Sequence, residues 1–160
     1  GNLVQLSSDP DSDVRMGVAD NKTASEALLI QLSKDPEFRV RVKVALNTAT
    51  PASILTHLSK DTEYYVRQAV ARNRSAPDEV LLELAMDDSY IVREDLASNT
   101  SCPIEALTRL EKDPYEVLLN LSENPATPKD IIKRLITDRD RAVRISALRT
   151  YLHSHLKIAQ

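Results

Sequence analysis

The hydrophobic positions along the chain recur in short helical groups. In one group the apolar side chains Ile54, Leu55 and Leu58 follow an i, i+1, i+4 spacing, and in the next group Val66 and Val70 follow an i, i+4 spacing. This spacing places them on one face of a helix, whereas a half-buried strand alternates apolar and polar residues. Helices this short are marginally stable alone. The pattern therefore predicts pairs of short helices that bury their apolar faces against neighbouring pairs.

The same pattern returns about every 26 residues, together with three polar columns. The aspartate column contains Asp9, Asp35, Asp61, Asp87, Asp113 and Asp138. The arginine column, always preceded by valine, contains Arg15, Arg41, Arg67, Arg93 and Arg144. The asparagine column contains Asn21, Asn47, Asn73, Asn99 and Asn124. Agreement across so many columns predicts six repeats, at approximately 1–24, 25–50, 51–76, 77–102, 103–127 and 128–160.

Proline and asparagine predict where each helix begins and ends. Thr50-Pro51 and Asp35-Pro36 each place a capping residue before a proline at the first helical position. The asparagine of each repeat is expected to end the second helix, because Asn tolerates the left-handed conformation at a helix C-terminus. The sequence therefore predicts one all-α domain over residues 1–160, a superhelical solenoid of about six two-helix repeats.

The repeat unit resembles that of a known family. It reads approximately L-x-x-L-x-x-D-P-x-x-x-V-R-x-x-V-A-x-N-x-x-x-P, best seen in residues 29–51 and 55–77. This pattern is similar to the leucine-rich repeat variant family, whose fold is helical, and the resemblance covers nearly the whole chain. The D-x-x-x-x-V-R part is also similar to HEAT repeats, in which Asp and Arg form hydrogen-bonded ladders along the stack.

The HEAT similarity implies a structural ladder, with Asp35 paired with Arg41 and Asp61 paired with Arg67. An anion-binding stripe is the alternative interpretation of the arginines. The asparagine column is expected to cap helices and to bond to the backbone of neighbouring repeats. The predicted ladder residues are Asp35, Arg41, Asn47, Asp61, Arg67, Asn73, Asp87, Arg93 and Asn99.

Cysteine content limits the cofactors that the chain can hold. A known relative of the leucine-rich repeat variant family carries an iron–sulfur cluster on a separate cysteine-rich segment. Such clusters need several cysteine ligands, and Cys102 is the only cysteine of this chain. His153 and His155 are close in sequence but have no evident third ligand for a metal. We therefore predict no cofactor and no metal site, and a reducing, cytoplasmic location.

Composition excludes other classes of function. With 42% hydrophobic and 28% charged residues, the 160-residue chain is typical of a soluble globular protein, and no apolar run is long enough to predict a membrane span. A net charge of -3 makes a broad phosphate-binding surface, and hence nucleic-acid binding, unlikely. No nucleophile–base pair or glycine-rich loop stands apart from the repeat, so no enzymatic activity is predicted.

The exposed positions of the second helix differ from repeat to repeat, unlike the packing positions. Val42, Leu46, Ile91 and Leu119 are apolar on a face that is expected to turn away from the core, which indicates a groove for a protein or peptide. A solvated face that tolerates apolar residues is the alternative. The predicted partner-binding residues are Arg39, Val42, Leu46, Tyr65, Gln68, Arg72, Ile91, Glu94 and Leu119.

A second hypothesis is a nucleic-acid-binding or base-repair protein of the HEAT-like kind. It would need a basic stripe and an aromatic ring that stacks on bases. Phe38, Tyr64, Tyr90 and Tyr115 form a row at equivalent positions, which favours packing on the adjoining repeat over stacking on a ligand. The second and third repeats carry Arg39, Lys43, Arg72 and Arg74, but the fourth carries Asp87, Asp88, Glu94 and Asp95.

The fifth repeat departs from the consensus. The spacing from Asp113 to Val117 is one residue short, and Leu118 stands where an arginine is expected. We therefore predict that Asp113 loses its ladder partner, that the ladder breaks there, and that the last two repeats open first.

Overall fold

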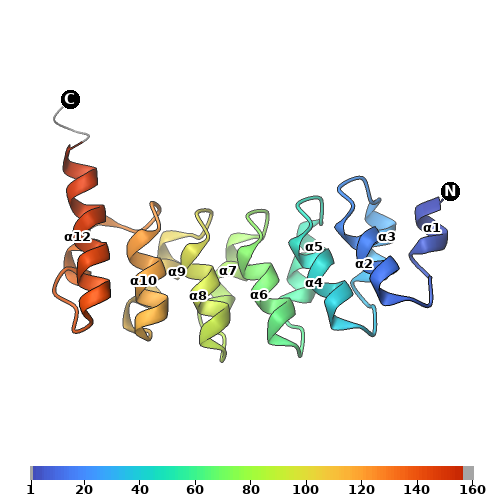
Figure 1. The fold of residues 1–160 in the computed structure, drawn as a ribbon, viewed down its shortest axis with the longest axis horizontal. Helices are drawn as coiled ribbons and strands as arrows, with labels where there is room; N and C mark the ends of the chain where they lie inside the picture. The colour runs from blue at the N-terminus through green and yellow to red at the C-terminus, as the bar shows by residue number, and fades with distance from the viewer. Residues whose placement is uncertain (1, 157–160) are drawn as a thin grey trace. The chain divides into compact units, whose positions relative to one another are not determined.

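The computed structural model describes residues 2–156, and all regular structure in that range is helical (Figure 1). The first helices are α1 (Asn2–Leu6), α2 (Ser12–Asp20), α3 (Glu26–Leu32), α4 (Phe38–Leu46), α5 (Ala52–Leu58) and α6 (Tyr64–Arg72). The following helices are α7 (Asp78–Leu84), α8 (Tyr90–Ser98), α9 (Ile104–Arg109), a short 3₁₀ helix η1 (Leu110–Lys112), α10 (Tyr115–Glu123), α11 (Lys129–Leu135) and α12 (Arg141–Leu156).

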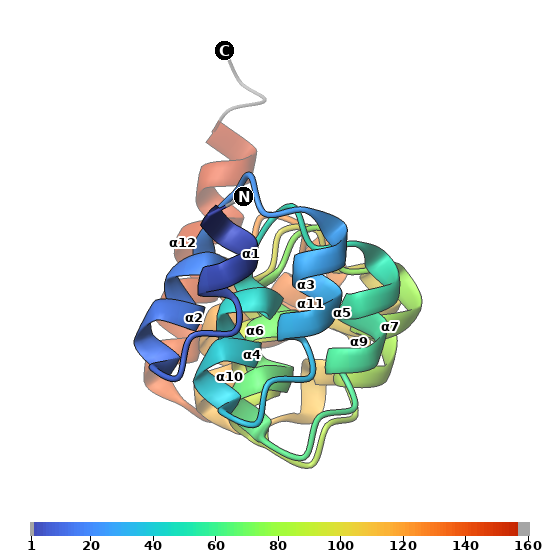
Figure 2. The ribbon, with the colours of Figure 1, turned by 90° about the vertical axis from the view of Figure 1, so that its right-hand side faces the viewer.

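The chain divides into two compact units, residues 1–80 and 81–160, with the division inside α7. In the first unit, α3 and α5 form one layer and α2, α4 and α6 form the other (Figure 2). The second helices pack in series, α2 on α4 and α4 on α6, and each first helix packs on the second helix of its own repeat. Helix α1 packs on α2.

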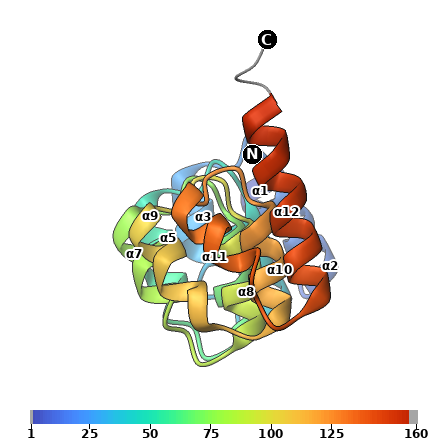
Figure 3. The ribbon, with the colours of Figure 1, turned by 90° about the vertical axis from the view of Figure 1, so that its left-hand side faces the viewer.

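The second unit is built in the same way. Helices α9 and α11 form one layer and α8, α10 and α12 form the other (Figure 3). Helix α10 contacts both α8 and α12, and α11 contacts α12. The prediction of an all-α solenoid of two-helix repeats is confirmed.

The second to fifth repeats contribute the same apolar positions to the core. Leu55 and Val66 are fully buried, and Leu58 is 1% exposed. The equivalent side chains of other repeats are also buried: Leu29, Leu32, Val40 and Val44 in the first unit, and Leu81, Leu84, Val92, Leu96, Leu107, Leu110, Val117 and Leu121 in the second. Full burial of one such side chain contributes about 1.5 to 3 kcal/mol. Stacking therefore supplies the stability that a single helix pair lacks.

The second helices end where the sequence predicts, but the helix starts differ from the prediction. Asn47 is the C-cap of α4, as predicted, although its φ near −68° is not the left-handed conformation. Thr50 is not the N-cap of α5, because Pro51 occupies that position; the buried Thr50 hydroxyl instead donates to the carbonyl of Val44 at 2.6 Å. The N-cap of α4 is Glu37, and Asp35, two residues before it, accepts the Glu37 N–H at 2.9 Å.

Helix α12 is longer than the other second helices, 16 residues against nine. Thr150 stands where the asparagine of the other repeats would end the helix, and the helix continues through this position. Leu148, which is 43% exposed, occupies a column that holds small buried residues in the other repeats. Those residues are Ala19, Ala45, Ala71, Ala97 and Ser122. The sixth repeat therefore has a different surface from the repeats before it.

Candidate binding groove

The arginine column forms hydrogen-bonded ladders between consecutive repeats. Arg41 Nε donates to Oδ2 of Asp61 at 2.7 Å, and Nη2 donates to Oδ1 of the same carboxylate at 3.0 Å. The remaining nitrogen, Nη1, donates to the carbonyl oxygen of Asp35 at 2.7 Å. One guanidinium therefore joins the backbone of its own repeat to the carboxylate of the next repeat.

The HEAT similarity implied that the Asp carboxylate of a repeat pairs with the Arg of the same repeat, and this prediction is wrong for Asp35 and Asp61. The Asp35 carboxylate accepts from Arg15 Nε and Nη2 at 2.7 and 3.0 Å, across 20 residues of sequence. Arg93 binds Asp113 in the same way, with distances of 2.7 to 3.1 Å. Arg67 Nη1 donates to the carbonyl oxygen of Asp61, the aspartate of its own repeat, at 2.8 Å.

These contacts change the ionisation of the ladder aspartates. Burial raises the pKa of Asp61, because a carboxylate loses hydration when it leaves water. The hydrogen bonds from Arg41 and from the Glu63 N–H act in the opposite direction and prevail, so the pKa lies below its usual 3.8. The pKa of Asp35 is lowered by the same balance, with Arg15 as the donor.

The interruption of the ladder lies one interface later than predicted. Asp113 keeps its partner, Arg93, so the expectation that it loses one is wrong. The arginine that would bind the Asp138 carboxylate is missing, because the buried Leu118 occupies the arginine position of the fifth repeat. Within the described residues, the Asp138 carboxylate accepts only the N–H of Asp140, at 2.8 Å.

Other contacts join the fifth and sixth repeats at this interface. Arg134 of α11 bonds to both carboxylate oxygens of Glu111. The hydroxyl of Ser122 donates to the hydroxyl of Ser146 on α12 at 2.8 Å. The interface therefore replaces a buried ladder bond with a partly exposed ion pair and a buried hydroxyl contact.

The asparagine column supplies a second set of inter-repeat bonds. Nδ2 of Asn47 donates to the carbonyl oxygens of Ala19 and Asn21 at 2.8 and 3.0 Å. Its Oδ1 accepts the N–H of Ala49 at 2.9 Å. Asn73 and Asn124 make the same bonds to the repeat before them. The Asp, Arg and Asn side chains of these columns therefore hold the repeats together.

Six of the predicted partner-binding residues lie together in the first unit. A groove of about 250 Å³ crosses the second helices α2, α4 and α6. The predicted residues that line it are Arg39, Val42, Leu46, Tyr65, Gln68 and Arg72. The sequence-based list omitted the other lining residues, which are Met16, Phe38, Lys43 and Ala69. Met16 and Lys43 occur at half-buried positions of the second helix that differ between repeats, so this variation was the signal that could have found them.

Aromatic rings form one side of the groove. Phe38 of α4 stacks on Tyr65 of α6, with ring centroids 5.7 Å apart and an interplanar angle of 25°. The ring of Tyr64 lies 4.0 Å from that of Tyr65. Tyr65 is nevertheless 46% exposed. Phe38 therefore packs on a ring of the neighbouring repeat, but that ring, Tyr65, lies outside the predicted row, and Tyr90 and Tyr115 of the row are 44% and 51% exposed.

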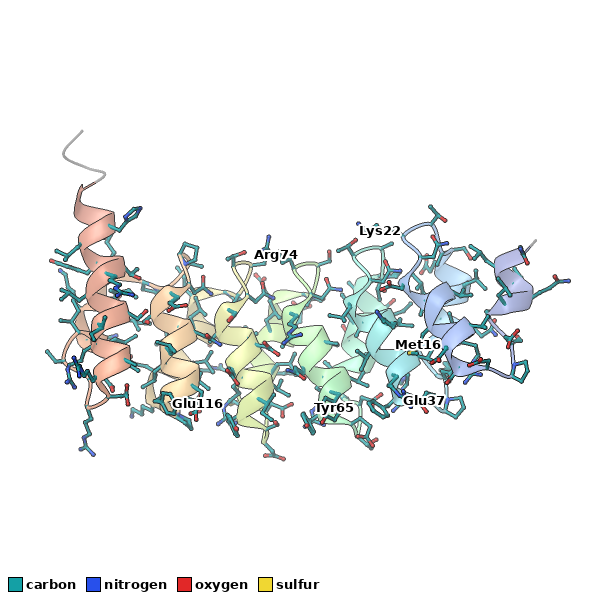
Figure 4. All side chains as sticks on the ribbon, in the orientation of Figure 1. Met16, Lys22, Glu37, Tyr65, Arg74 and Glu116 are labelled. Carbon is teal, nitrogen blue, oxygen red and sulfur yellow. The ribbon has the colours of Figure 1, made fainter. Side chains whose placement is uncertain are left out.

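Charged side chains surround this apolar centre. Arg39 Nε donates to Glu37 Oε1 at 3.2 Å, and Lys43 Nζ lies 3.5 Å from an Asp20 carboxylate oxygen. Figure 4 shows Lys22 and Arg74 in the loops that follow α2 and α6, at the edge of the unit opposite Glu37 and Tyr65. Among the described side chains that line the groove, three are cationic and none is a carboxylate.

The remaining predicted residues lie in the second unit and not in this groove. Ile91 and Glu94 are half-buried on α8, and Leu119 is half-buried on α10. Helices α8 and α10 pack on each other, and Asn120 donates to the carbonyl of Glu94 at 3.2 Å. The six predicted residues of the first unit are therefore brought together in one groove, and Ile91, Glu94 and Leu119 do not line it.

In the described part of the chain, no three His, Cys, Asp or Glu side chains gather as metal ligands. The side chain of His155 lies outside the described residues. No described helix combines the length and apolar character needed to cross a membrane.

Comparisons with known proteins agree with this architecture. The family model described as leucine rich repeat variant matches residues 64–89. A solved structure described as a leucine-rich repeat variant with a novel repetitive structural motif is 26% identical, with a TM-score of 0.69 over 92% of this chain. This chain spans 59% of the length of that protein.

Two engineered proteins of known structure share the fold. Each is 20% identical to this chain, and their TM-scores are 0.50 and 0.54 over 94% of it. No curated protein sequence gives a significant match. The repeat columns and the helix pairs confirm that the chain is an all-α helical-repeat protein, and the match over residues 64–89 supports its resemblance to the leucine-rich repeat variant family.

Proposed function

We propose that this protein is a non-enzymatic scaffold that binds a segment of another protein in the groove across α2, α4 and α6. The observation that carries the proposal is the combination of a concave apolar surface with side chains that differ from those at equivalent places in other repeats. Val42 and Leu46 are only partly covered although they are apolar, and Leu46 is 37% exposed. Exposed apolar side chains grouped in a groove are typical of a protein-binding surface.

The ladder and the asparagine bonds support a scaffold. They hold α2, α4 and α6 in register through side chains that face away from the groove lining, since neither Arg41 nor Asn47 lines it. A surface on a rigid stack loses little conformational freedom on binding, which favours affinity. The groove side chains can therefore vary without changing the fold.

Cytoplasmic location is part of this proposal. The single cysteine, Cys102, is 5% exposed, and a chain without disulfides is typical of reducing compartments. The groove also contains no histidine, cysteine or serine that could act as a nucleophile or base among its described lining residues. This composition supports binding in preference to catalysis.

A peptide-display selection tests the proposal without assuming a partner. The full chain, Val42→Glu and Thr56→Glu would each be used to select from one random peptide library. Val42 and Thr56 have the same branched shape, but Thr56 is exposed on α5, outside the groove. We expect the wild type and Thr56→Glu to enrich the same peptides and Val42→Glu to lose them. No enrichment, or the same peptides from Val42→Glu, would show that the groove is not the binding site.

A gel-shift assay tests the nucleic-acid alternative. Low salt strengthens any binding through phosphate contacts, so it gives the alternative its best chance. We expect no shift of single-stranded or duplex DNA or RNA at low salt. If the wild type shifts the nucleic acid and Val42→Glu does not, the groove binds nucleic acid and the protein-binding proposal is wrong.

A further inference from the structure

The charges around the groove of the first unit indicate the chemistry of its ligand. Arg39, Lys43 and Arg72 line the groove, and no described lining side chain is acidic. Lys22 and Arg74 lie at the edge that follows α2 and α6 (Figure 4). Two carboxylates lie beside these cations, with Glu37 at 3.2 Å from Arg39 Nε and Asp20 at 3.5 Å from Lys43 Nζ, but neither lines the groove. The excess of cations in the lining occurs in a chain whose net charge is −3, so it is a local feature and not a consequence of composition.

Helix dipoles explain only part of this arrangement. Lys43 and Arg72 lie in the last turns of α4 and α6, where a cation is favoured by the negative end of the helix. Arg39 lies in the first turn of α4, where the dipole disfavours a cation. Its side chain is 62% exposed and bonds to Glu37 through Nε alone, and the described residues offer no partner to its two Nη atoms. Those two atoms can donate in parallel to one carboxylate.

The size of the groove limits how much of a ligand it can enclose. Its volume of about 250 Å³ is smaller than the roughly 300–1,000 Å³ that is typical of small-molecule pockets. Met16, Val42 and Leu46 provide apolar surface, and the ring of Tyr65 forms a wall. The groove therefore fits one large apolar side chain of a longer segment better than a whole small molecule.

We propose that the groove binds an acidic protein segment, which inserts one large apolar side chain between α4 and α6 and places carboxylates on Arg39 and Lys43. This inference rests on the proposed function and specifies the class of partner. The second helices α8 and α10 of the second unit carry Glu94, Asp95, Glu116 and Glu123, which would repel such a segment, whereas α12 carries Arg141, Arg144 and Arg149. We expect binding at the groove of the first unit, where the cations line an apolar surface.

Three fluorescein-labelled peptides of about 12 residues separate the charge from the anchor. The first is rich in glutamate with one central phenylalanine, the second replaces that phenylalanine with serine, and the third replaces every glutamate with glutamine. Fluorescence anisotropy would measure their binding to the full chain. We expect the first peptide to bind about tenfold more tightly than either of the others, and salt to weaken it, because exposed charges are screened.

Charge-reversal variants locate the contact. Lys43→Glu should weaken the first peptide about tenfold, because it removes an attraction and adds a repulsion. Lys133→Glu changes the net charge equally at an exposed position of α11 and should leave binding unchanged. Equal effects of the two variants would overturn the assignment to the groove.

The possible results separate this inference from the proposed function. If the glutamine peptide binds as tightly as the glutamate peptide, the acidic preference is wrong, while binding of a segment in the groove stands. If the display selection fails, both proposals fail. If oligothymidine displaces the peptide with equal affinity, the ligand of the groove is a nucleic acid and not an acidic protein segment. If the chain self-associates in sedimentation and Lys43→Glu abolishes this self-association, the ligand is a second copy of the chain.

Discussion

Arg41 binds the carboxylate of Asp61, 20 residues further along the chain, while it holds only the carbonyl oxygen of Asp35, six residues before it. The charge pair therefore crosses from one repeat to the next. Its side chains are 14% and 9% exposed, so water competes weakly for these hydrogen bonds.

Arg41→Ala should lower the free energy of unfolding by about 2 to 4 kcal/mol, because it leaves a largely buried carboxylate and a carbonyl without their donor. Arg39→Ala is the matched control, since its side chain is 62% exposed and surface changes usually stay within about 0.5 kcal/mol. Urea unfolding followed by circular dichroism would measure both variants. Equal midpoints would contradict the role assigned to the ladder.

Stability should fall in acid because of the ladder aspartates. The folded-state pKa of Asp61 and of Asp35 is lowered, so each carboxylate contributes stability that is present above its unfolded pKa. That contribution is lost as the pH falls from the usual value of 3.8 through the lower folded value. Asp61→Asn should therefore be less stable than wild type at neutral pH, and the difference should shrink below pH about 4.

Thermal unfolding of both proteins across this pH range would check the acid prediction. The Asp13→Asn variant is the control, since Asp13 is exposed on α2 and accepts no bond from an arginine of the described chain. A constant difference between Asp61→Asn and wild type at every pH would show that the ladder carboxylate does not cause the acid sensitivity.

Asn47→Ala should destabilise the first unit by about 1 to 3 kcal/mol, because the carbonyl of Ala19 would be left buried without a donor. Asn47 is 5% exposed, so water cannot readily replace the lost amide. Thr48→Ala, at an exposed neighbouring position, should change the unfolding free energy little. Similar midpoints in urea for the two variants would exclude a stabilising role of the asparagine column.

The sixth repeat should open before the first. The first repeat is joined to the second by Arg15 and Asp35, whereas Leu118 leaves Asp138 without an arginine in the described structure. In a solenoid, stability is approximately a sum over repeats and their interfaces. Amides of α12 between residues 141 and 150 should therefore exchange faster than those of α2. Equal protection of the amides of α2 and α12 from exchange would show that the Arg134–Glu111 contact fully compensates for the missing arginine at Asp138.

The sequence by itself determined the repeat length, the pairs of helices and the core. Leu55, Leu58, Val66 and Val70 are buried because the period of an amphipathic helix is visible in one chain and each pair must cover its apolar face. The structural role of the Asp, Arg and Asn columns also followed from recurrence, since only a contact made in every repeat requires the same side chain each time.

The tertiary structure decided which partners these columns have. Arg41 can reach Asp35 or Asp61 on sequence grounds, and only the offset between stacked repeats selects the latter carboxylate. The same offset moved the interruption of the ladder from Asp113 to Asp138. The groove could be predicted only in part, because its volume depends on how Phe38 and Tyr65 of adjacent repeats stack. Distances across a stack are set by packing between repeats, and no pattern within one repeat contains them.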